Sequence, residues 1–180
     1  MSFNDIIESH QPNSTPLANP EGYCLILAGG LGSRLWPYSQ ESKPKQFLDI
    51  FGTGRTLLQQ TYDRFAAFIK PENIFISTCE QYLDLVKEQL PQVPRAQIIA
   101  EPLRRGTLAS VAIGSLIIAA RRNVQASIIC TPADQWITDT QAFCQDIQQG
   151  LSFVIQGKLA ILDHGNLAVA CPQVKSDSPA

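Results

Sequence analysis

The chain has 180 residues, of which 44% are hydrophobic, and a formal net charge of −2 from 14 basic and 16 acidic side chains. That length is enough for one ordinary domain with a real core, and the near-neutral charge gives no electrostatic case for nucleic acid or membrane surfaces as partners. No apolar run is long enough to span a bilayer, and the first ten residues lack the features of a signal peptide.

Strands and helices alternate along the chain. Residues 1–21 are rich in Asn, Ser, Pro and acidic side chains, so we expect a flexible tail there, with no more than a short helix at 3–8. Buried strands are expected at 23–28, 73–78, 96–100, 126–131 and 158–162, with a short extended piece at 47–50. Helices are expected at 56–69, 80–90, 106–122 and 139–155.

The apolar, β-branched strands predict the fold class. Alternation of such strands with helices is typical of a three-layer α/β/α arrangement, with a mostly parallel, Rossmann-like sheet covered on both faces. In these sheets ligands bind beyond the carboxyl ends of the strands. We therefore expect functional residues directly after Ala28, Thr78, Ala100 and Thr131.

Residues 25–48, LILAGGLGSRLWPYSQESKPKQFL, carry the most chemical information. A buried strand ends here in three glycines within four residues, and two cations, Arg34 and Lys45, follow. Glycine lets a ligand approach the main chain closely. Successive backbone N–H groups can curl round an anion while cations neutralise the remaining charge. The stretch predicts a phosphate-binding loop, in which we expect Trp36 to face the core.

Three kinds of phosphate loop compete for this stretch. The P-loop spacing GxxxxGK[ST] does not occur. The dinucleotide pattern GxGxxG finds its first two glycines, but Leu35 stands in place of the third. The stretch closely resembles the signature of mannose-1-phosphate guanylyltransferases, which have GG-x-G-x-RLWP, then S, then PKQFL.

Glu101 follows the third expected strand. From its residue type alone it is either a solvated turn acid or a base-reading group, because a carboxylate accepts both donors of the guanine Watson–Crick edge and adenine cannot supply that pair. The family that the chain resembles carries EP-x-x-RNTAPAIA at this place. The matching residues here are Glu101, Pro102, Arg105 and Thr107, while Gly106 replaces the Asn and residues 108–110 read LAS instead of APA.

Asp134 follows the fourth expected strand. A carboxylate there either caps a turn or holds Mg²⁺, a hard ion that prefers carboxylate and phosphate oxygens. The family pattern is P-S/A-D-H, in which Asp134 matches the metal-binding acid and Gln135 stands in place of the His.

The resemblance implies the nucleotide-diphospho-sugar transferase fold and a reaction that joins GTP to mannose 1-phosphate, releasing pyrophosphate and forming GDP-mannose for polysaccharide biosynthesis. By this resemblance Arg34 and Lys45 are catalytic and contact the triphosphate, and Asp134 holds Mg²⁺. The nucleotide-binding residues that it implies are Leu27, Ala28, Gly29, Gly30, Gly32, Ser33, Glu101, Arg105 and Thr107.

The resemblance stops before the end of the chain. It divides the sequence into the tail at 1–21, a nucleotidyltransferase domain at 22–162 and a divergent C-terminal tail at 163–180. The family continues with a GI-x-P…TGYGYI segment and a second metal-binding acid, which are absent here. We therefore expect a C-terminally truncated form whose acceptor site is largely missing and which alone has little or no transferase activity.

Two other functions stay open: a non-catalytic GTP-binding regulatory or partner subunit, and a dinucleotide-dependent oxidoreductase. The five cysteines form no CxxC pair, which favours reduced thiols and a cytoplasmic protein. A homo-oligomer is compatible with the sequence, which does not specify the oligomeric state.

Overall fold

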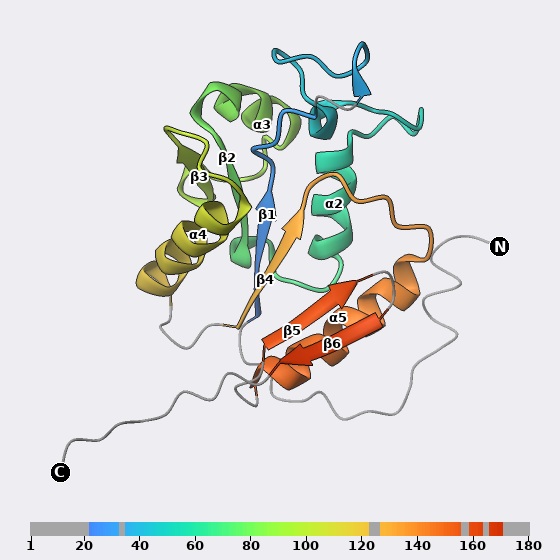
Figure 1. Ribbon diagram of the computed structural model, residues 1–180, viewed down its shortest axis with the longest axis vertical. Coiled ribbons are helices and arrows are strands. Elements are labelled where there is room, and N and C mark those ends of the chain that lie inside the picture. The colour runs from blue at the N-terminus through green and yellow to red at the C-terminus, as the bar shows by residue number, and fades with distance from the viewer. Residues whose placement is uncertain (1–21, 33–34, 123–126, 156–158, 164–165, 171–180) are drawn as a thin grey trace.

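A computed structural model describes residues 22–32, 35–122, 127–155, 159–163 and 166–170, and it shows a twisted sheet flanked by helices (Figure 1). The strands of this sheet are β1 (Gly22–Leu27), β2 (Ile74–Cys79), β3 (Ile98–Glu101) and β4 (Ser127–Pro132). The α-helices among the described residues are α2 (Leu57–Ala66), α3 (Leu83–Gln89), α4 (Thr107–Arg121) and α5 (Thr140–Ile155). A separate hairpin contains β5 (Leu159–Asp163) and β6 (Asn166–Ala170).

The main sheet has the strand order β3-β2-β1-β4, and every pairing in it is parallel. Ile26 of β1 lies opposite Ile76 of β2 on one side and Thr131 of β4 on the other. Because β1 has a neighbour on each side, the loop that leaves its carboxyl end is flanked by other strand ends. The predicted parallel α/β fold is confirmed.

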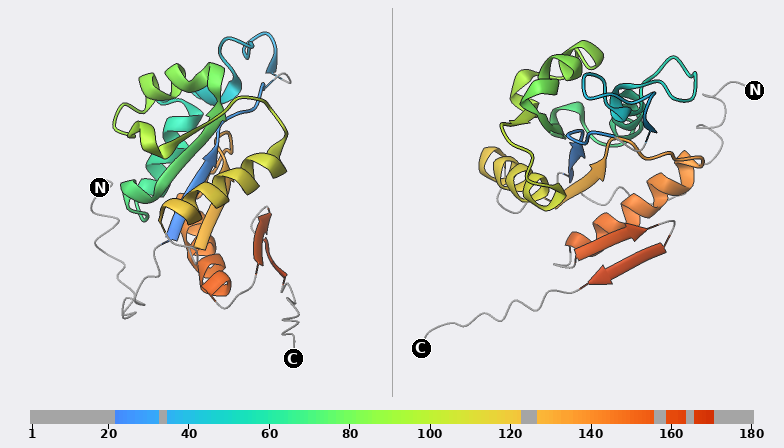
Figure 2. Two further views of the ribbon diagram at one scale, coloured as in Figure 1. Left: turned by 90° about the vertical axis from the view of Figure 1, so that its left-hand side faces the viewer. Right: turned by 45° about the horizontal axis from the view of Figure 1, so that its top comes forward.

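One face of the sheet is covered by α4, and the other by α2, α3 and α5 (Figure 2). On the α4 face, Tyr23 and Leu25 of β1 pack with Ile118 of the helix. Gly114 faces Leu25, and a Cβ added there would overlap the side chain of that leucine. The missing side chain therefore allows α4 to lie close against the central strand.

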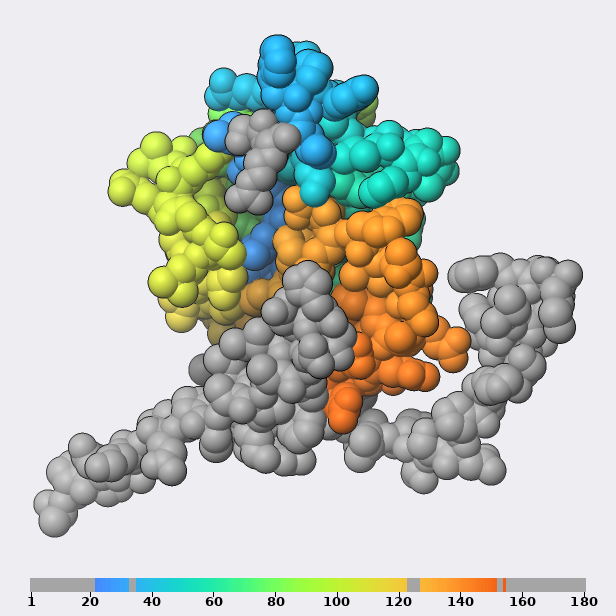
Figure 3. All heavy atoms as spheres, turned by 45° about the vertical axis from the view of Figure 1, so that its right-hand side comes forward, coloured from blue at the N-terminus to red at the C-terminus, as the bar shows by residue number. Residues whose placement is uncertain are grey.

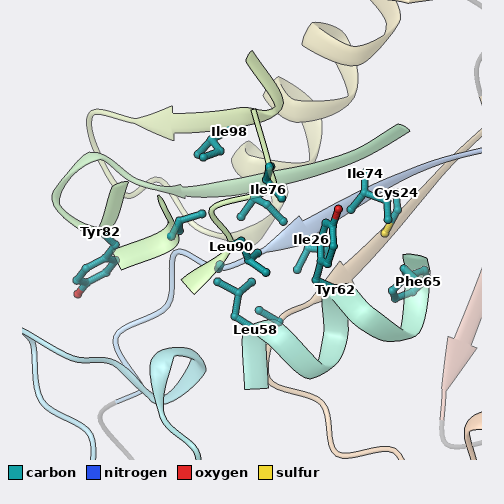
Figure 4. Packing of buried hydrophobic residues seen from close by; sticks show 14 of the residues in the cluster. Cys24, Ile26, Leu58, Tyr62, Phe65, Ile74, Ile76, Tyr82, Leu90 and Ile98 are labelled. Carbon is teal, nitrogen blue, oxygen red and sulfur yellow. The ribbon is translucent and has the colours of Figure 1, made fainter. Parts of the chain in front are cut away.

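The opposite face holds the larger core (Figure 4). There Cys24 and Ile26 of β1 pack with Leu58, Tyr62 and Phe65 of α2. The helix begins at a capping box, in which the Thr56 side chain accepts from the Gln59 backbone and the Gln59 side chain accepts from the Thr56 backbone. Burying a large apolar side chain contributes roughly 1.5–3 kcal/mol, so this packing holds the strand ends in fixed positions.

Three expectations are wrong. Residues 47–50 do not form one extended piece, because Phe47 ends a 3-10 helix, η2 (Lys45–Phe47), in which its N–H bonds to the Pro44 carbonyl, although the next residue, Leu48, has an extended backbone. The strand expected at 158–162 does not join the parallel sheet, because β5 pairs antiparallel with β6. Trp36 does not face the core: its side chain is 78% exposed, in a turn that the Ser39 N–H to Leu35 carbonyl bond closes.

Several expectations concern residues outside the described ranges, namely the tail at 1–21 and the last ten residues of the chain. The hairpin pairing of β5 with β6 crosses the domain boundary expected at residue 162. No helix in the described parts of the chain is long and apolar enough to cross a membrane. The described cysteines are free thiols, and complete burial raises the pKa of Cys24 well above its ordinary value.

Candidate functional site

The carboxyl ends of the parallel strands bring together residues that are far apart in the sequence. Residues 28–32 leave β1, Thr78 lies at the end of β2, Glu101 ends β3 and Asp134 follows β4. In Figure 3, blue atoms of the chain around β1 lie in a recess between the yellow-green start of α4 and the orange segment after β4. These residues thus all lie at the carboxyl end of the parallel sheet, spread from β3 across to β4.

Gly32 is required on steric grounds. Its φ is +65°, in the left-handed region. A Cβ at this position would stand 2.7 Å from Lys45 Cβ, 2.8 Å from Ser39 Oγ and 2.9 Å from Lys45 N. Gly30 differs, because it is exposed and a Cβ there would meet nothing within 4 Å. Gly32 therefore sets the loop against Lys45, whereas Gly30 leaves open space above the loop.

The carbonyl groups of the loop are held from beneath. Gln46 is buried, with 4% of its surface exposed, and its Nε2 donates to the carbonyls of Ala28 and Gly30, both at 2.9 Å. Thr78 Oγ1 donates to the same Ala28 carbonyl at 3.1 Å. Within the part of the chain that the structure describes, no hydrogen bond has a backbone N–H of residues 29–32 as its donor. The carbonyls of Ala28 and Gly30 are thus held by side chains, while the N–H groups of the loop have no acceptor among the described residues. Backbone N–H groups arranged in this way can bind an anion.

Lys45 and Asp134 lie in direct contact. The Lys45 Nζ is 3.2 Å from Asp134 Oδ2 and donates to the Asp134 backbone carbonyl at 3.4 Å. Asp134 is positioned by its neighbour Ala133, whose N–H donates to the Leu27 carbonyl and whose carbonyl accepts from Thr61 Oγ1. Both members of the pair are partly exposed, at 30% and 43%. The cation and the acid of the predicted site therefore meet beside the glycine loop.

Asp134 fits Mg²⁺ as a single carboxylate ligand. Mg²⁺ usually keeps several waters and is bound through one or two carboxylates plus substrate phosphates. The described residues contain no group of three or more His, Cys, Asp or Glu side chains that would hold a metal ion. A Mg²⁺ ion at Asp134 would therefore complete its ligands with water and, when a nucleotide is bound, with phosphate oxygens.

Glu101 is buried rather than solvated, with 8% of its surface exposed. Its Oε1 accepts from Ser77 Oγ at 2.5 Å, and its Oε2 accepts from Ser110 Oγ at 2.9 Å. A carboxylate has about four acceptor sites, so both oxygens can accept further hydrogen bonds from a ligand. The two serines fix the orientation of this carboxylate, which excludes the solvated turn acid.

The remaining predicted side chains either make no hydrogen bond to a described residue or lie outside the described residues. Arg105 and Thr107 are exposed at the start of α4, and neither side chain makes a hydrogen bond to a described residue. Ser33 and Arg34 lie outside the described residues. The adjacent Arg104 is also exposed, but its side chain is bonded to the protein, because its Nη2 donates to the Tyr82 hydroxyl at 2.6 Å.

Sequence reasoning missed the groups that orient the predicted ones. Gln46 adjoins Lys45 in the PKQFL stretch, which is the signal that could have indicated it. Ser77 and Thr78 could have been recognised because they are polar residues near the end of an otherwise apolar strand. Ser110 gave no comparable signal, since its contact with Glu101 depends on how α4 packs against the sheet.

Comparisons with known proteins show which family the chain resembles. A family profile described as "Nucleotidyl transferase" matches residues 23–158. Mannose-1-phosphate guanylyltransferase 2 of Escherichia coli O157:H7 is 37% identical over 139 residues, which are 75% of this chain and 28% of the relative. Xanthan biosynthesis protein XanB of Xanthomonas campestris pv. campestris is 36% identical over 137 residues, 75% of this chain and 29% of that protein. The chain thus spans less than a third of the length of these relatives.

Solved structures give the same picture of the fold. A mannose-1-phosphate geranyltransferase from Thermus thermophilus superposes with a TM-score of 0.67 at 31% identity, over 76% of this chain and 39% of the other. A mannose-6-phosphate isomerase from Helicobacter pylori gives a TM-score of 0.60 at 22% identity, over 81% of this chain and 53% of the other. The second match bears on the fold alone.

Proposed function

The chain belongs to the nucleotidyl transferase family, and on that premise we propose that residues 28–32 and Lys45 bind the phosphates of GTP and that Asp134 holds the Mg²⁺ ion that accompanies them. One observation carries the proposal: Gln46 and Thr78 hold the loop carbonyls from beneath, while the N–H groups of the loop have no partner among the described residues. Such an arrangement attracts anions and rejects cations. The ammonium of Lys45 beside the loop adds the positive charge that a triphosphate requires.

The proposed reaction is the transfer of a guanylyl group to mannose 1-phosphate. A phosphate oxygen of the sugar attacks the α-phosphorus of GTP, the bond to the bridging oxygen breaks, and pyrophosphate leaves. The attacking oxygen is already anionic, so the step needs no general base. This chain contributes positioning by the loop and charge neutralisation by Lys45 and Arg34. Mg²⁺ held by Asp134 would neutralise further charge on the phosphates.

Glu101 is the proposed guanine-selecting residue. Its carboxylate is buried and oriented by Ser77 and Ser110, with acceptor capacity left for a base. A buried acceptor discriminates strongly, because a base without the matching donors leaves it unpaired. Arg105 and Thr107, exposed beside this carboxylate, are proposed to contact the nucleotide once it is bound.

The sugar substrate and the complete transferase activity are proposed from the names of relatives more than three times as long as the match. The name of XanB supports a role in supplying nucleotide sugars for polysaccharide biosynthesis, and we propose that this role is cytoplasmic. A second candidate, a GTP-binding subunit without turnover, is favoured by the departures at Gly106 and Gln135 from the family motifs.

Calorimetric titration with GTP and with ATP, each with and without Mg²⁺, tests the proposal. We expect GTP to bind more tightly than ATP, and binding to strengthen with Mg²⁺. Asp134→Asn should remove the Mg²⁺ effect, and Glu101→Gln should narrow the difference between the nucleotides. Asp84→Asn, at an exposed position of α3, is the matched control and should change neither the Mg²⁺ effect nor the preference for GTP. Failure to bind GTP, or equal affinity for ATP, contradicts the proposal, and GTP binding without release of pyrophosphate in the presence of mannose 1-phosphate favours the second candidate.

A further inference from the structure

The Gln46 side chain lies beneath the loop rather than in it. It is almost fully buried in the short helix η2, and its amide nitrogen bonds two carbonyls of the loop, those of Ala28 and Gly30, at equal distances of 2.9 Å. We propose that Gln46 is a positioning residue that fixes which way the phosphate loop presents its N–H groups. This inference rests on the proposed function, because it assigns a role in phosphate binding.

The argument follows from peptide geometry. A trans peptide unit is planar, and its C=O and N–H point in opposite directions. The carbonyl of Ala28 shares a unit with the N–H of Gly29, and the carbonyl of Gly30 shares a unit with the N–H of Leu31. When Gln46 binds both carbonyls below the loop, the two N–H groups point above it.

The glycines make this anchoring necessary. Glycine adopts many backbone conformations with little steric penalty, so the units around Gly29 and Gly30 can turn over if nothing holds them. A reversed unit presents a carbonyl to the ligand, and a carbonyl repels phosphate. Gln46 is suited to the task because one amide NH₂ group supplies two donors, whereas an ionised carboxylate at the same place supplies none.

The protein contains its own control for this role. Gln97 is equally buried, with 5% of its surface exposed, and its Nε2 also bonds two carbonyls, those of Pro71 at 2.7 Å and Ile74 at 2.6 Å. It lies beside Ile74 at the amino end of β2, whereas the phosphate loop lies at the carboxyl ends of the strands. Gln46 and Gln97 therefore share burial and bonding and differ in position alone.

The test compares Gln46→Met with Gln97→Met by thermal unfolding and by titration with pyrophosphate, GTP and guanosine. Both variants lose the same kind of hydrogen bonds, so both should unfold at lower temperature than the wild type. We expect Gln46→Met to bind pyrophosphate and GTP about tenfold more weakly or worse, because hydrogen bonds to a charged group are among the strong ones. Its affinity for guanosine should stay within about twofold of wild type, as should every affinity of Gln97→Met.

Equal phosphate affinities of the two variants would show that Gln46 is merely structural, and would overturn the inference while leaving the proposed function intact. A wild-type protein that binds no phosphate ligand overturns both. If Gln46→Met does not fold, Gln46→Asn decides, because it keeps a buried amide that is one methylene too short to hold both loop carbonyls at 2.9 Å. We expect it to weaken pyrophosphate binding about two- to fivefold, and unchanged binding in that variant also overturns the inference.

Discussion

Replacing single glycines of the loop by alanine separates what each of them does. Gly32→Ala adds a methyl group where the backbone is left-handed and where three atoms already stand within 2.9 Å of the new carbon. Gly30→Ala adds the same methyl group where nothing lies within 4 Å. The first change should therefore act on the fold, and the second on the ligand.

The expected magnitude for Gly32→Ala has two parts. A left-handed conformation costs a residue with a Cβ about 1–2 kcal/mol. Overlap in a packed region costs about 1–3 kcal/mol more, and it is not easily relieved here, because two of the contacted atoms are the backbone N and the Cβ of Lys45. The sum, about 2–5 kcal/mol, corresponds to a fall in Tm of about 4–20 °C for a chain of this size. It also displaces Lys45, so GTP affinity should fall as well.

Gly52→Ala provides the matched control for backbone strain. Gly52 has the same φ of +65°, but a Cβ there would meet nothing within 4 Å. It should lose about 1–2 kcal/mol and keep its GTP affinity. Gly30→Ala should lose no stability, and should bind GTP about tenfold more weakly, because the methyl group takes up space that phosphate needs to reach the N–H groups.

Thermal unfolding and GTP titration of the three variants check these values. Equal stabilities of Gly32→Ala and Gly52→Ala would show that the loop is not packed against Lys45. Unchanged GTP binding by Gly30→Ala would show that phosphate does not lie above the loop. Either result refutes the corresponding part of the reasoning.

Three further predictions concern the surroundings of the loop. Lys45→Met should raise the affinity of the nucleotide-free protein for Mn²⁺ about tenfold, because it removes a positive charge 3.2 Å from the Asp134 carboxylate. Electron paramagnetic resonance of free Mn²⁺ measures this affinity, and the control Lys43→Met should leave the Mn²⁺ affinity unchanged. Ser110→Ala should reduce the preference for GTP over ATP severalfold in titrations, since Glu101 loses one of its two orienting hydroxyls; an unchanged preference argues against that role. Because burial raises the pKa of Cys24, its thiol should stay protonated at pH 8 and resist iodoacetamide until the protein is unfolded, as peptide mass spectrometry would reveal.

The sequence was sufficient to predict the parallel sheet and to place the candidate residues at the carboxyl ends of its strands. Strands such as β2 begin with consecutive apolar residues that point to both faces of the sheet, and that pattern indicates a parallel sheet between helices. Chain order then places Lys45 and Asp134 near the same edge, since each follows a strand of that sheet. Their contact across 89 sequence positions was not predictable, because it depends on how η2 packs beneath the loop.

The failures have a common physical cause, which is that local patterns do not report tertiary neighbours. The largely apolar residues at 47–50 suit a strand, but no strand among the described residues pairs with them, and Phe47 is buried in a 3-10 turn instead. Trp36 is large and apolar, yet its turn projects from the domain. In the same way β5 has a strand-like composition and pairs with β6 rather than with β4.

Glycine content alone does not make a phosphate loop, and the structure shows why. Glycines permit many orientations of the peptide units, including those that present carbonyls to the ligand. The orientation of the peptide units in this loop is set by groups outside it, namely the Gln46 amide, the Thr78 hydroxyl and the backbone of Lys45 against Gly32. A glycine-rich motif therefore predicts a phosphate site reliably only when the sequence also supplies donors that bind its carbonyls from the side away from the ligand.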